Sequence, residues 1–239
     1  MASLTSPPGK LVRTLILAYV PAGAILGAVA LVSQLYGVNA GTFTRDPANI
    51  LKFPWYLGGL SHLGVLLWCG TMSVCLLTVG ATVTEEVPPR LRPFLLGAGL
   101  LSAALLFDDL FLFHEVIGPR LLDVPERYVH ASYGLATLAL LVAFRATILE
   151  TDYLILGVAG GFLLLSQVAD TLTNTAPDTS VKFLVEDGLK FLGIVGWFTY
   201  FVSVCLAALK ARSLPASSRP AAGGGPVGSV AGTHQGGAR

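Results

Sequence analysis

The sequence predicts an all-α integral membrane protein, a bundle of six transmembrane helices with a disordered C-terminal tail. Two observations lead to this class. The chain of 239 residues is 54% hydrophobic and only 12% charged, with a mean hydropathy of +0.72, whereas about 25% of a soluble domain is charged. Six stretches also reach the roughly 20 mostly apolar residues that cross a bilayer. The composition therefore indicates a polytopic membrane protein.

The first span is expected over residues 11–36, after an N-terminal tail of residues 1–10. Its basic start resembles a signal peptide, but the apolar run exceeds the roughly 7–15 residues of a signal h-region. We therefore expect an uncleaved span. The other spans are expected at residues 55–83, 93–116, 125–149, 153–173 and 183–209, separated by connections rich in turn-forming residues. One transmembrane domain would then cover residues 11–212.

Two features mark ends of these elements. Asp123 stands three residues before Glu126 and predicts a capping box at the start of the fourth span. Beyond residue 212 the chain is mostly Gly, Ala, Ser and Pro, with almost no apolar side chains to bury. We expect residues 213–239 to be disordered.

Basic residues in the connections predict the orientation. Among the Lys and Arg residues of the connections and span ends up to Arg219, eight fall on the side of the termini and five on the other side. The positive-inside rule then predicts cytoplasmic termini and a multi-pass protein of the plasma membrane. The formal net charge of +1 gives no basic excess for nucleic acid. The three cysteines lie in apolar stretches without metal-ligand spacing and are interpreted as buried packing residues.

Nearly all ionisable residues of the apolar stretches fall near one end of the predicted bundle, on the outer side. Charge at membrane depth is costly and is kept mainly where it functions. Counting 1.5 Å per residue places His62 and Lys190 roughly 10 Å inside, and Asp108 roughly 10 Å short of the same face. The polar cluster consists of His62, Asp108, Asp109, His114, Glu115, Glu126, His130, Asp170, Asn174, Glu186, Asp187 and Lys190.

Helical phase predicts which of these side chains meet. Asp108 and Glu115 are seven residues apart and would share a face of a continuous helix, with Asp109 turned by about 100°. Glu126 and His130 are i, i+4 neighbours. Glu186 and Lys190 have the same spacing, in the order that favours an ion pair within a helix.

Imidazole and carboxylate groups are the ligands of catalytic zinc and related ions. A divalent metal such as zinc is one candidate cofactor, because bound metal generates a hydroxide nucleophile at neutral pH. The alternative is that these side chains are helix-end and loop residues that reach interfacial water. Asp108 and Asp109 would repel each other unless one is protonated or both share a cation. The expected metal ligands are His62, His114, His130, Asp109 and Asp170, and the expected catalytic residues are Asp108, Asp109, Glu115 and His130.

Three functions stay open at this point. The first is a metal-dependent, hydrolase-like enzyme that acts on a lipid or another membrane-embedded substrate at the outer face. The second is a non-catalytic assembly or sensing component, whose polar layer binds a membrane protein partner and whose small residues permit close helix packing. The third is a small transporter coupled to protons or cations, with the carboxylates as carriers. All three have the lipid bilayer as a partner, and none involves nucleic acid.

Overall fold

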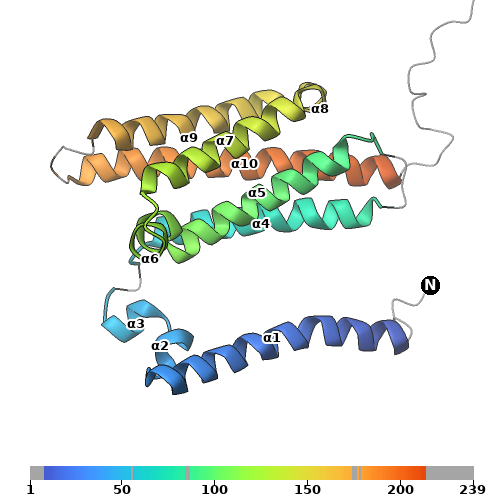
Figure 1. Cartoon of the computed structure of the whole chain (residues 1–239). Helices are drawn as coiled ribbons and strands as arrows, with labels where there is room; N and C mark the ends of the chain where they lie inside the picture. Colours follow the sequence, from blue (N-terminus) through green and yellow to red (C-terminus); the bar gives the residue numbers. More distant parts are fainter. Residues whose placement is uncertain (1–7, 55, 84–86, 174–176, 178, 214–239) are drawn as a thin grey trace, which may run out of the picture. The chain divides into compact units, whose positions relative to one another are not determined.

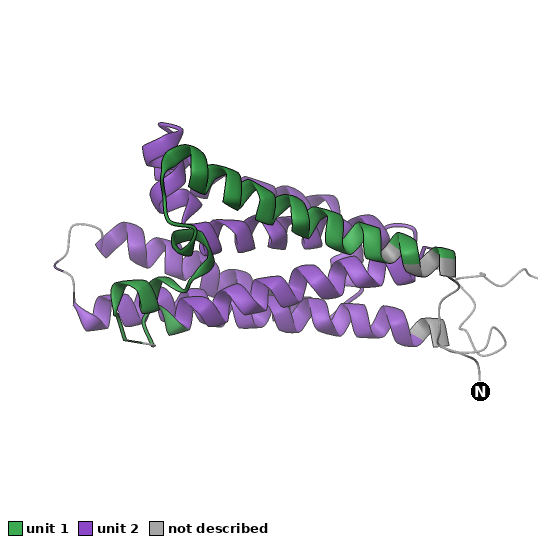
Figure 2. Ribbon diagram, turned by 90° about the horizontal axis from the view of Figure 1, so that it is seen from below, with its two compact units in different colours: residues 1–59 green, residues 60–239 purple. Residues whose placement is uncertain are grey.

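The computed structural model describes residues 8–54, 56–83, 87–173, 177 and 179–213, and this part of the chain contains helices and no strand. The expected disordered tail lies almost wholly outside the described residues. The chain divides into two compact units, residues 1–59 and 60–239, which Figure 2 colours separately. The polar cluster predicted from the sequence belongs entirely to the second unit.

The first unit consists of one long helix and two short ones. Helix α1 runs over Pro8–Tyr36 and includes Pro21. Gly37 follows with a φ of +63°, a conformation that glycine adopts without a steric penalty. Helix α2 covers Gly41–Thr44, and α3 covers Pro47–Leu51. Asp46 caps α3 by accepting a hydrogen bond from the Asn49 amide, as expected for an aspartate before a first-turn proline.

The second unit is built from long helices that lie side by side (Figure 1). Helix α4 covers Gly59–Ala81 and α5 covers Leu91–Phe111. A π-helical turn, η1, covers Phe113–Ile117, and the short helix α6 covers Gly118–Leu121. The chain then continues with α7 (Glu126–Ala143), α8 (Arg145–Leu149), α9 (Tyr153–Thr173) and α10 (Ser180–Ser213).

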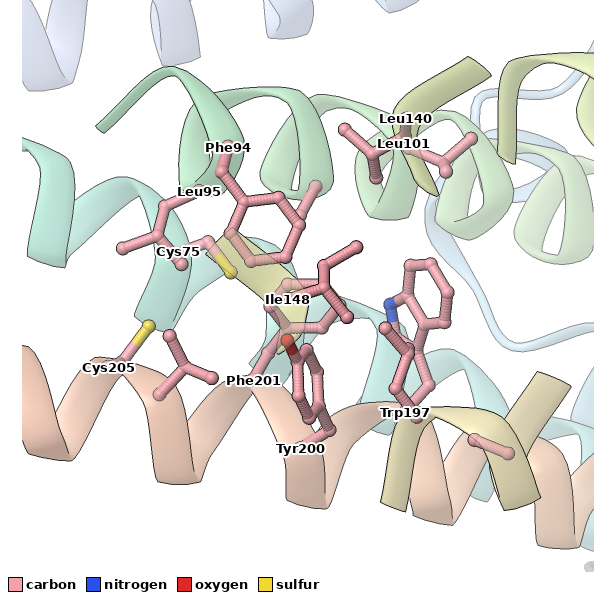
Figure 3. Packing of buried hydrophobic residues seen from close by; sticks show 14 of the residues in the cluster. Cys75, Phe94, Leu95, Leu101, Leu140, Ile148, Trp197, Tyr200, Phe201 and Cys205 are labelled. Atoms are coloured by element: carbon pink, nitrogen blue, oxygen red, sulfur yellow. The ribbon is translucent and has the colours of Figure 1, made fainter. Parts of the chain in front are cut away.

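The core of the second unit is aromatic and draws on α4, α5, α7, α8, α9 and α10. Trp197 of α10 packs edge-on against Trp68 of α4, with ring centroids 6.1 Å apart. Phe201, one turn further along α10, packs against Phe94 of α5 at 5.6 Å, and Figure 3 shows these α10 rings side by side. The buried positions of α10 recur every three or four residues, so one stripe of this helix faces the core.

Buried polar groups in the core have hydrogen-bond partners. The Trp197 indole donates to the Ser102 hydroxyl at 3.1 Å. The Tyr200 hydroxyl lies 2.8 Å from the Thr151 hydroxyl. Burying such groups without a partner costs about 1–3 kcal/mol each. These two bonds therefore let α10 carry polar aromatics into an apolar core.

Within the described residues, five helical segments are long and apolar enough to cross a membrane: Leu15–Tyr36, Gly59–Ala81, Leu91–Phe111, Tyr153–Thr173 and Ser180–Lys210. Large apolar side chains also cover their outer faces, for example Leu77, Leu154 and Leu172, each at least 70% exposed. A water-soluble protein rarely exposes apolar surface on this scale. These features indicate a membrane protein.

The expected fourth span differs from the helices observed. Helix α7 ends at Ala143, and Phe144 separates it from α8 with a φ of −110° and a ψ of +18°. The capping box predicted for its start is wrong: Pro125 is the N-cap residue, and no side chain caps the helix. Asp123 instead adopts a left-handed conformation with a φ of +53°, after which the Val124 amide donates to the Gly118 carbonyl at 3.0 Å.

Helices α9 and α10 approach each other at two glycines. A Cβ atom added at Gly196 would lie 2.8 Å from the Cβ and 3.2 Å from the Cα of Ala159. A Cβ added at Gly193 would lie 2.6 Å from Leu163 Cγ. Small residues at such positions let two helix backbones come close and gain van der Waals contact.

Replacing Gly196 by alanine should destabilise the fold by about 1–3 kcal/mol, the usual cost of overpacking a tight contact. Gly188→Ala on the same helix is the matched control, because a Cβ there meets nothing within 4 Å. Thermal unfolding of both variants in detergent measures the difference. Equal melting temperatures for the two variants would show that α9 and α10 do not pack this closely.

Candidate functional site

Polar side chains from several helices meet at one end of the second unit, where α5, α9 and η1 end and α4, α7 and α10 begin (Figure 1). Contacts between these elements are direct. Asp109 at the end of α5 contacts Trp68 of α4 and Lys190 of α10. His114 of η1 packs its ring on that of His130 of α7. The residues named from the sequence therefore divide into those that join this cluster and those that do not.

Asp108 and His114 form the most buried polar pair of the cluster. The His114 Nδ1 atom lies 2.6 Å from Asp108 Oδ2. The His114 backbone amide donates to Asp108 Oδ1 at 2.9 Å, so both carboxylate oxygens bind the same residue. The side chains are only 6% and 10% exposed for Asp108 and His114 respectively. This double contact fixes the orientation of the imidazole ring.

A backbone break after α5 brings these two residues together. Leu112 adopts a left-handed conformation, with a φ of +53° and a ψ of +44°, and its amide donates to the Asp108 carbonyl. A non-glycine residue in this region costs roughly 1–2 kcal/mol. The third helix thus ends at Phe111 and not at residue 116. The expected shared face of Asp108 and Glu115 is wrong, because the continuous helix that it required stops before Leu112.

Asp109 is bound by two residues from other helices. Its Oδ1 atom lies 2.7 Å from Lys190 Nζ, and its Oδ2 atom accepts a hydrogen bond from the Trp68 indole at 3.0 Å. The Asp109 side chain is 9% exposed and that of Lys190 is 42% exposed. Within the described residues Lys190 pairs with Asp109, so the ion pair expected between Glu186 and Lys190 is not formed. A buried carboxylate is stabilised by a counter-charge, and Lys190 supplies this charge to Asp109 on a neighbouring helix.

A second group surrounds the outer nitrogen of His114. His114 Nε2 lies 3.5 Å from Glu115 Oε1. The rings of His114 and His130 have centroids 4.7 Å apart. His130 Nε2 lies 4.0 Å from Glu126 Oε1, as their i, i+4 spacing predicts, and His130 Nδ1 lies 3.4 Å from the Gln167 amide nitrogen of α9. The two glutamates are more than half exposed, so this side of the cluster opens to the outside.

The remaining expected residues lie at the margin of the cluster. His62 is exposed in the first turn of α4 and joins no group of potential metal ligands in the described part of the chain. Asp170 is exposed, close enough to His130 to influence it electrostatically. Glu186 accepts a hydrogen bond from the Thr173 hydroxyl and so links α10 to α9. Asp187 is exposed. Asn174 lies outside the described residues.

In the part of the chain that the structure describes, two sets of three residues bring potential ligand atoms within 4.8 Å of one another. One set is Asp108, Asp109 and His114, and the other is His114, Glu126 and His130. His114 belongs to both. Its Nδ1 atom already contacts Asp108, which leaves Nε2, 3.5 Å from Glu115 Oε1, as the ring nitrogen available to a cation. The arrangement can hold a divalent cation on two imidazoles and a carboxylate, with room for water on the exposed side.

Trp68 and Tyr133 contact the cluster but were not among the residues expected from the sequence. Trp68 binds Asp109, and Tyr133 lies near enough to Asp108 and Asp109 to be influenced by their charges. Tyr133 follows His130 by three residues and therefore shares its helix face, so helical phase gives a signal for it. Trp68 lies in an apolar stretch and looks there like an ordinary core residue, so the sequence gives no signal for its contact with Asp109.

These features define an all-helical protein with helices of membrane-spanning length and an Asp/His cluster at one end of its bundle. Residues 16–204 match the family described as Domain of unknown function (DUF8692). The match covers most of the chain, which therefore belongs to this family. Neither the curated proteins nor the solved structures include a match to this chain.

Removing the Lys190 charge should destabilise the fold, because it leaves the buried Asp109 carboxylate with only the Trp68 donor. Loss of one partner of a buried ion pair costs about 3–5 kcal/mol. Lys190 is partly exposed, so we expect about 1–2 kcal/mol for Lys190→Met. The double variant Asp109→Asn/Lys190→Met should recover part of this loss. Denaturant unfolding of the four proteins measures the coupling, and additive effects would contradict a direct Asp109–Lys190 interaction.

Stability should also depend on pH through His114. Burial lowers the pKa of His114, but its hydrogen bond to Asp108 and the charge of that carboxylate raise it, and the net pKa is above the ordinary value of 6.5. A raised folded-state pKa stabilises the protein below pH 6.5, and this contribution disappears as the pH rises through the folded pKa. The stability difference between wild type and His114→Gln should shrink over that range. A difference that grows with pH would show that the ring is held neutral.

Proposed function

We propose that this chain is a six-span plasma-membrane protein with cytoplasmic termini, which binds a divalent metal such as zinc at its outer face. There it hydrolyses a lipid or another membrane-embedded substrate. The observation that carries the proposal is the contact of Asp108 with His114 Nδ1, at 2.6 Å. Histidines that bind metals usually donate their other nitrogen to a carboxylate, which fixes the ring and its tautomer. Asp108 is suited to that role.

The sixth crossing would come from α7 and α8 together. Helix α7 alone, with 18 residues, extends over about 27 Å at 1.5 Å per residue, and Phe144 and the five residues of α8 continue the chain at its end. This length is close to the hydrocarbon thickness of roughly 30 Å. No charged residue occurs between His130 and Arg145. A kink in a span is tolerated where neighbouring helices supply packing, and Phe144 packs on Phe94 of α5 with ring centroids 5.5 Å apart.

The second of the two ligand sets suits the metal better than the first. The first set requires Asp109, whose carboxylate already binds the Lys190 ammonium at 2.7 Å. A divalent cation there would face a fixed positive charge. The second set places His114, His130 and Glu126 together, and none of the three forms an ion pair with a lysine in the described part of the chain, although the charge of Lys190 still lowers the pKa of His114. We therefore assign these three as ligands and treat Asp109 as a residue that positions the end of α5.

The open side of this set favours hydrolysis over a closed structural metal. Three protein ligands and a free position are typical of catalytic zinc, whereas structural sites use four. When bound, the metal would lower the pKa of a water ligand and polarise a carbonyl oxygen. Glu115 lies 3.5 Å from His114 Nε2 and is exposed. This carboxylate is within reach of a water in the site and could accept its proton as a general base.

Purified wild-type protein should contain about one divalent metal ion per chain by elemental analysis. His130→Ala should lose most of it, because a second-set ligand is removed, whereas His62→Ala should retain it. Asp108→Asn should weaken metal binding by about 10–100-fold, the usual effect of losing such an outer carboxylate. A metal-free wild type, or His130→Ala with full metal content, would refute the assignment.

Hydrolysis is tested separately from metal binding, with Glu115→Gln as the variant. Its metal content should be unchanged, while hydrolysis of an ester- or amide-linked lipid in detergent should fall by about 10²–10⁴-fold, the range for a lost general base. If the wild-type protein binds metal but hydrolyses neither ester- nor amide-linked lipids, the proposal that it is a hydrolase is contradicted. That outcome would favour the sensing component.

A further inference from the structure

A groove of about 630 Å³ lies between α5 and α7 on the second unit. Its volume is in the range of small-molecule sites, about 300–1,000 Å³. Small side chains line it from both helices, among them Gly97, Ala104, Ala136 and Ala139. Ala104, Ala136 and Ala139 are exposed, so the groove opens along the outer face of the helix pair.

On both helices the groove ends one turn from the candidate metal site. Ala104 precedes Asp108 by four residues on α5. Tyr133 follows His130 by three residues on α7 and lies near enough to Asp108 and Asp109 to be influenced by their charges. The groove and the cluster are therefore continuous through Tyr133.

Polarity changes along the groove. At the far end, about 16 Å from Tyr133 along α7, it is lined by Phe144. The Ser132 hydroxyl beside Tyr133 donates to the Val129 carbonyl at 2.7 Å and is already satisfied. The rest of the lining is Gly, Ala, Leu and Phe. A ligand that fits has an apolar tail toward Phe144 and a polar group at Tyr133.

We propose that this groove binds one acyl chain of a lipid and presents the adjoining carbonyl to the site at His114 and His130. This proposal makes the proposed function more specific, and its statement about the substrate rests on that function. It names the substrate class as a lipid with an ester or amide next to the acyl chain. The metal ligands lie one turn beyond the groove, where the carbonyl of such a lipid would be placed.

A diazirine placed within the acyl chain of a palmitoyl lysophosphatidylcholine tests this in bilayer nanodiscs. Photolabelling followed by peptide mapping should locate adducts on the groove residues of α5 and α7. Ala136→Trp fills the groove and should reduce this labelling several-fold. Leu138→Trp is the matched control, since Leu138 is 57% exposed on the same helix outside the groove, and its labelling should equal that of wild type.

Three outcomes would overturn the inference. Adducts spread evenly over the exposed faces of α9 would mean ordinary contact with bulk lipid. Equal labelling of the two tryptophan variants would mean that the chain does not enter the groove. Absence of groove adducts, together with a crosslink from position 136 to α1, would mean that a helix of this chain fills it. Labelling of metal-free His130→Ala should persist, so a failed metal site and a failed lipid groove give different results.

Discussion

The arrangement of the site depends on two adjacent carboxylates that point in different directions. Asp108 and Asp109 differ by about 100° around α5. Asp109 therefore turns toward Lys190 and Trp68, while Asp108 turns toward His114. Each carboxylate is kept buried by its own partners, and the repulsion between them is offset locally. Three helices and the π-helical turn are fixed relative to one another by these contacts.

The price of this geometry is a strained backbone at Leu112. A left-handed leucine followed by a π-helical turn is unfavourable by itself. Two hydrogen bonds from His114 to one buried carboxylate offset that cost, because charge-assisted bonds in a low-dielectric setting are stronger than neutral ones. A strained backbone conformation of this kind persists only where contacts with the surrounding structure enforce it, and such positions are often functional sites. The break also directs His114 toward His130 and not along the α5 axis.

The length of the apolar stretches and the turn-forming residues between them were enough to predict the helical class and the ends of α9, which match the expected residues 153–173. They could not predict the break at Leu112, because leucine is an ordinary helix former and no glycine or proline marks the site. The sequence pattern also could not predict the Asp109–Lys190 ion pair, since it joins residues 81 positions apart. The sequence favoured the local alternative at i, i+4. Convergence of α5, α7 and α10 depends on tertiary packing that spacing alone does not encode.

The cluster consists of an inner and an outer layer, and His114 is the residue that belongs to both. The inner layer, Asp108, Asp109 and Trp68, is buried and has its polar atoms satisfied within the protein. The outer layer, Glu115 and Glu126, is exposed to the surroundings. A bound cation at the outer layer would act on Asp108 through space and also through the imidazole ring of His114, which contacts Asp108. His114 thus couples the exposed ligands to the buried carboxylates that hold α4, α5 and α10 together, so binding at this end of the bundle should also stabilise its core.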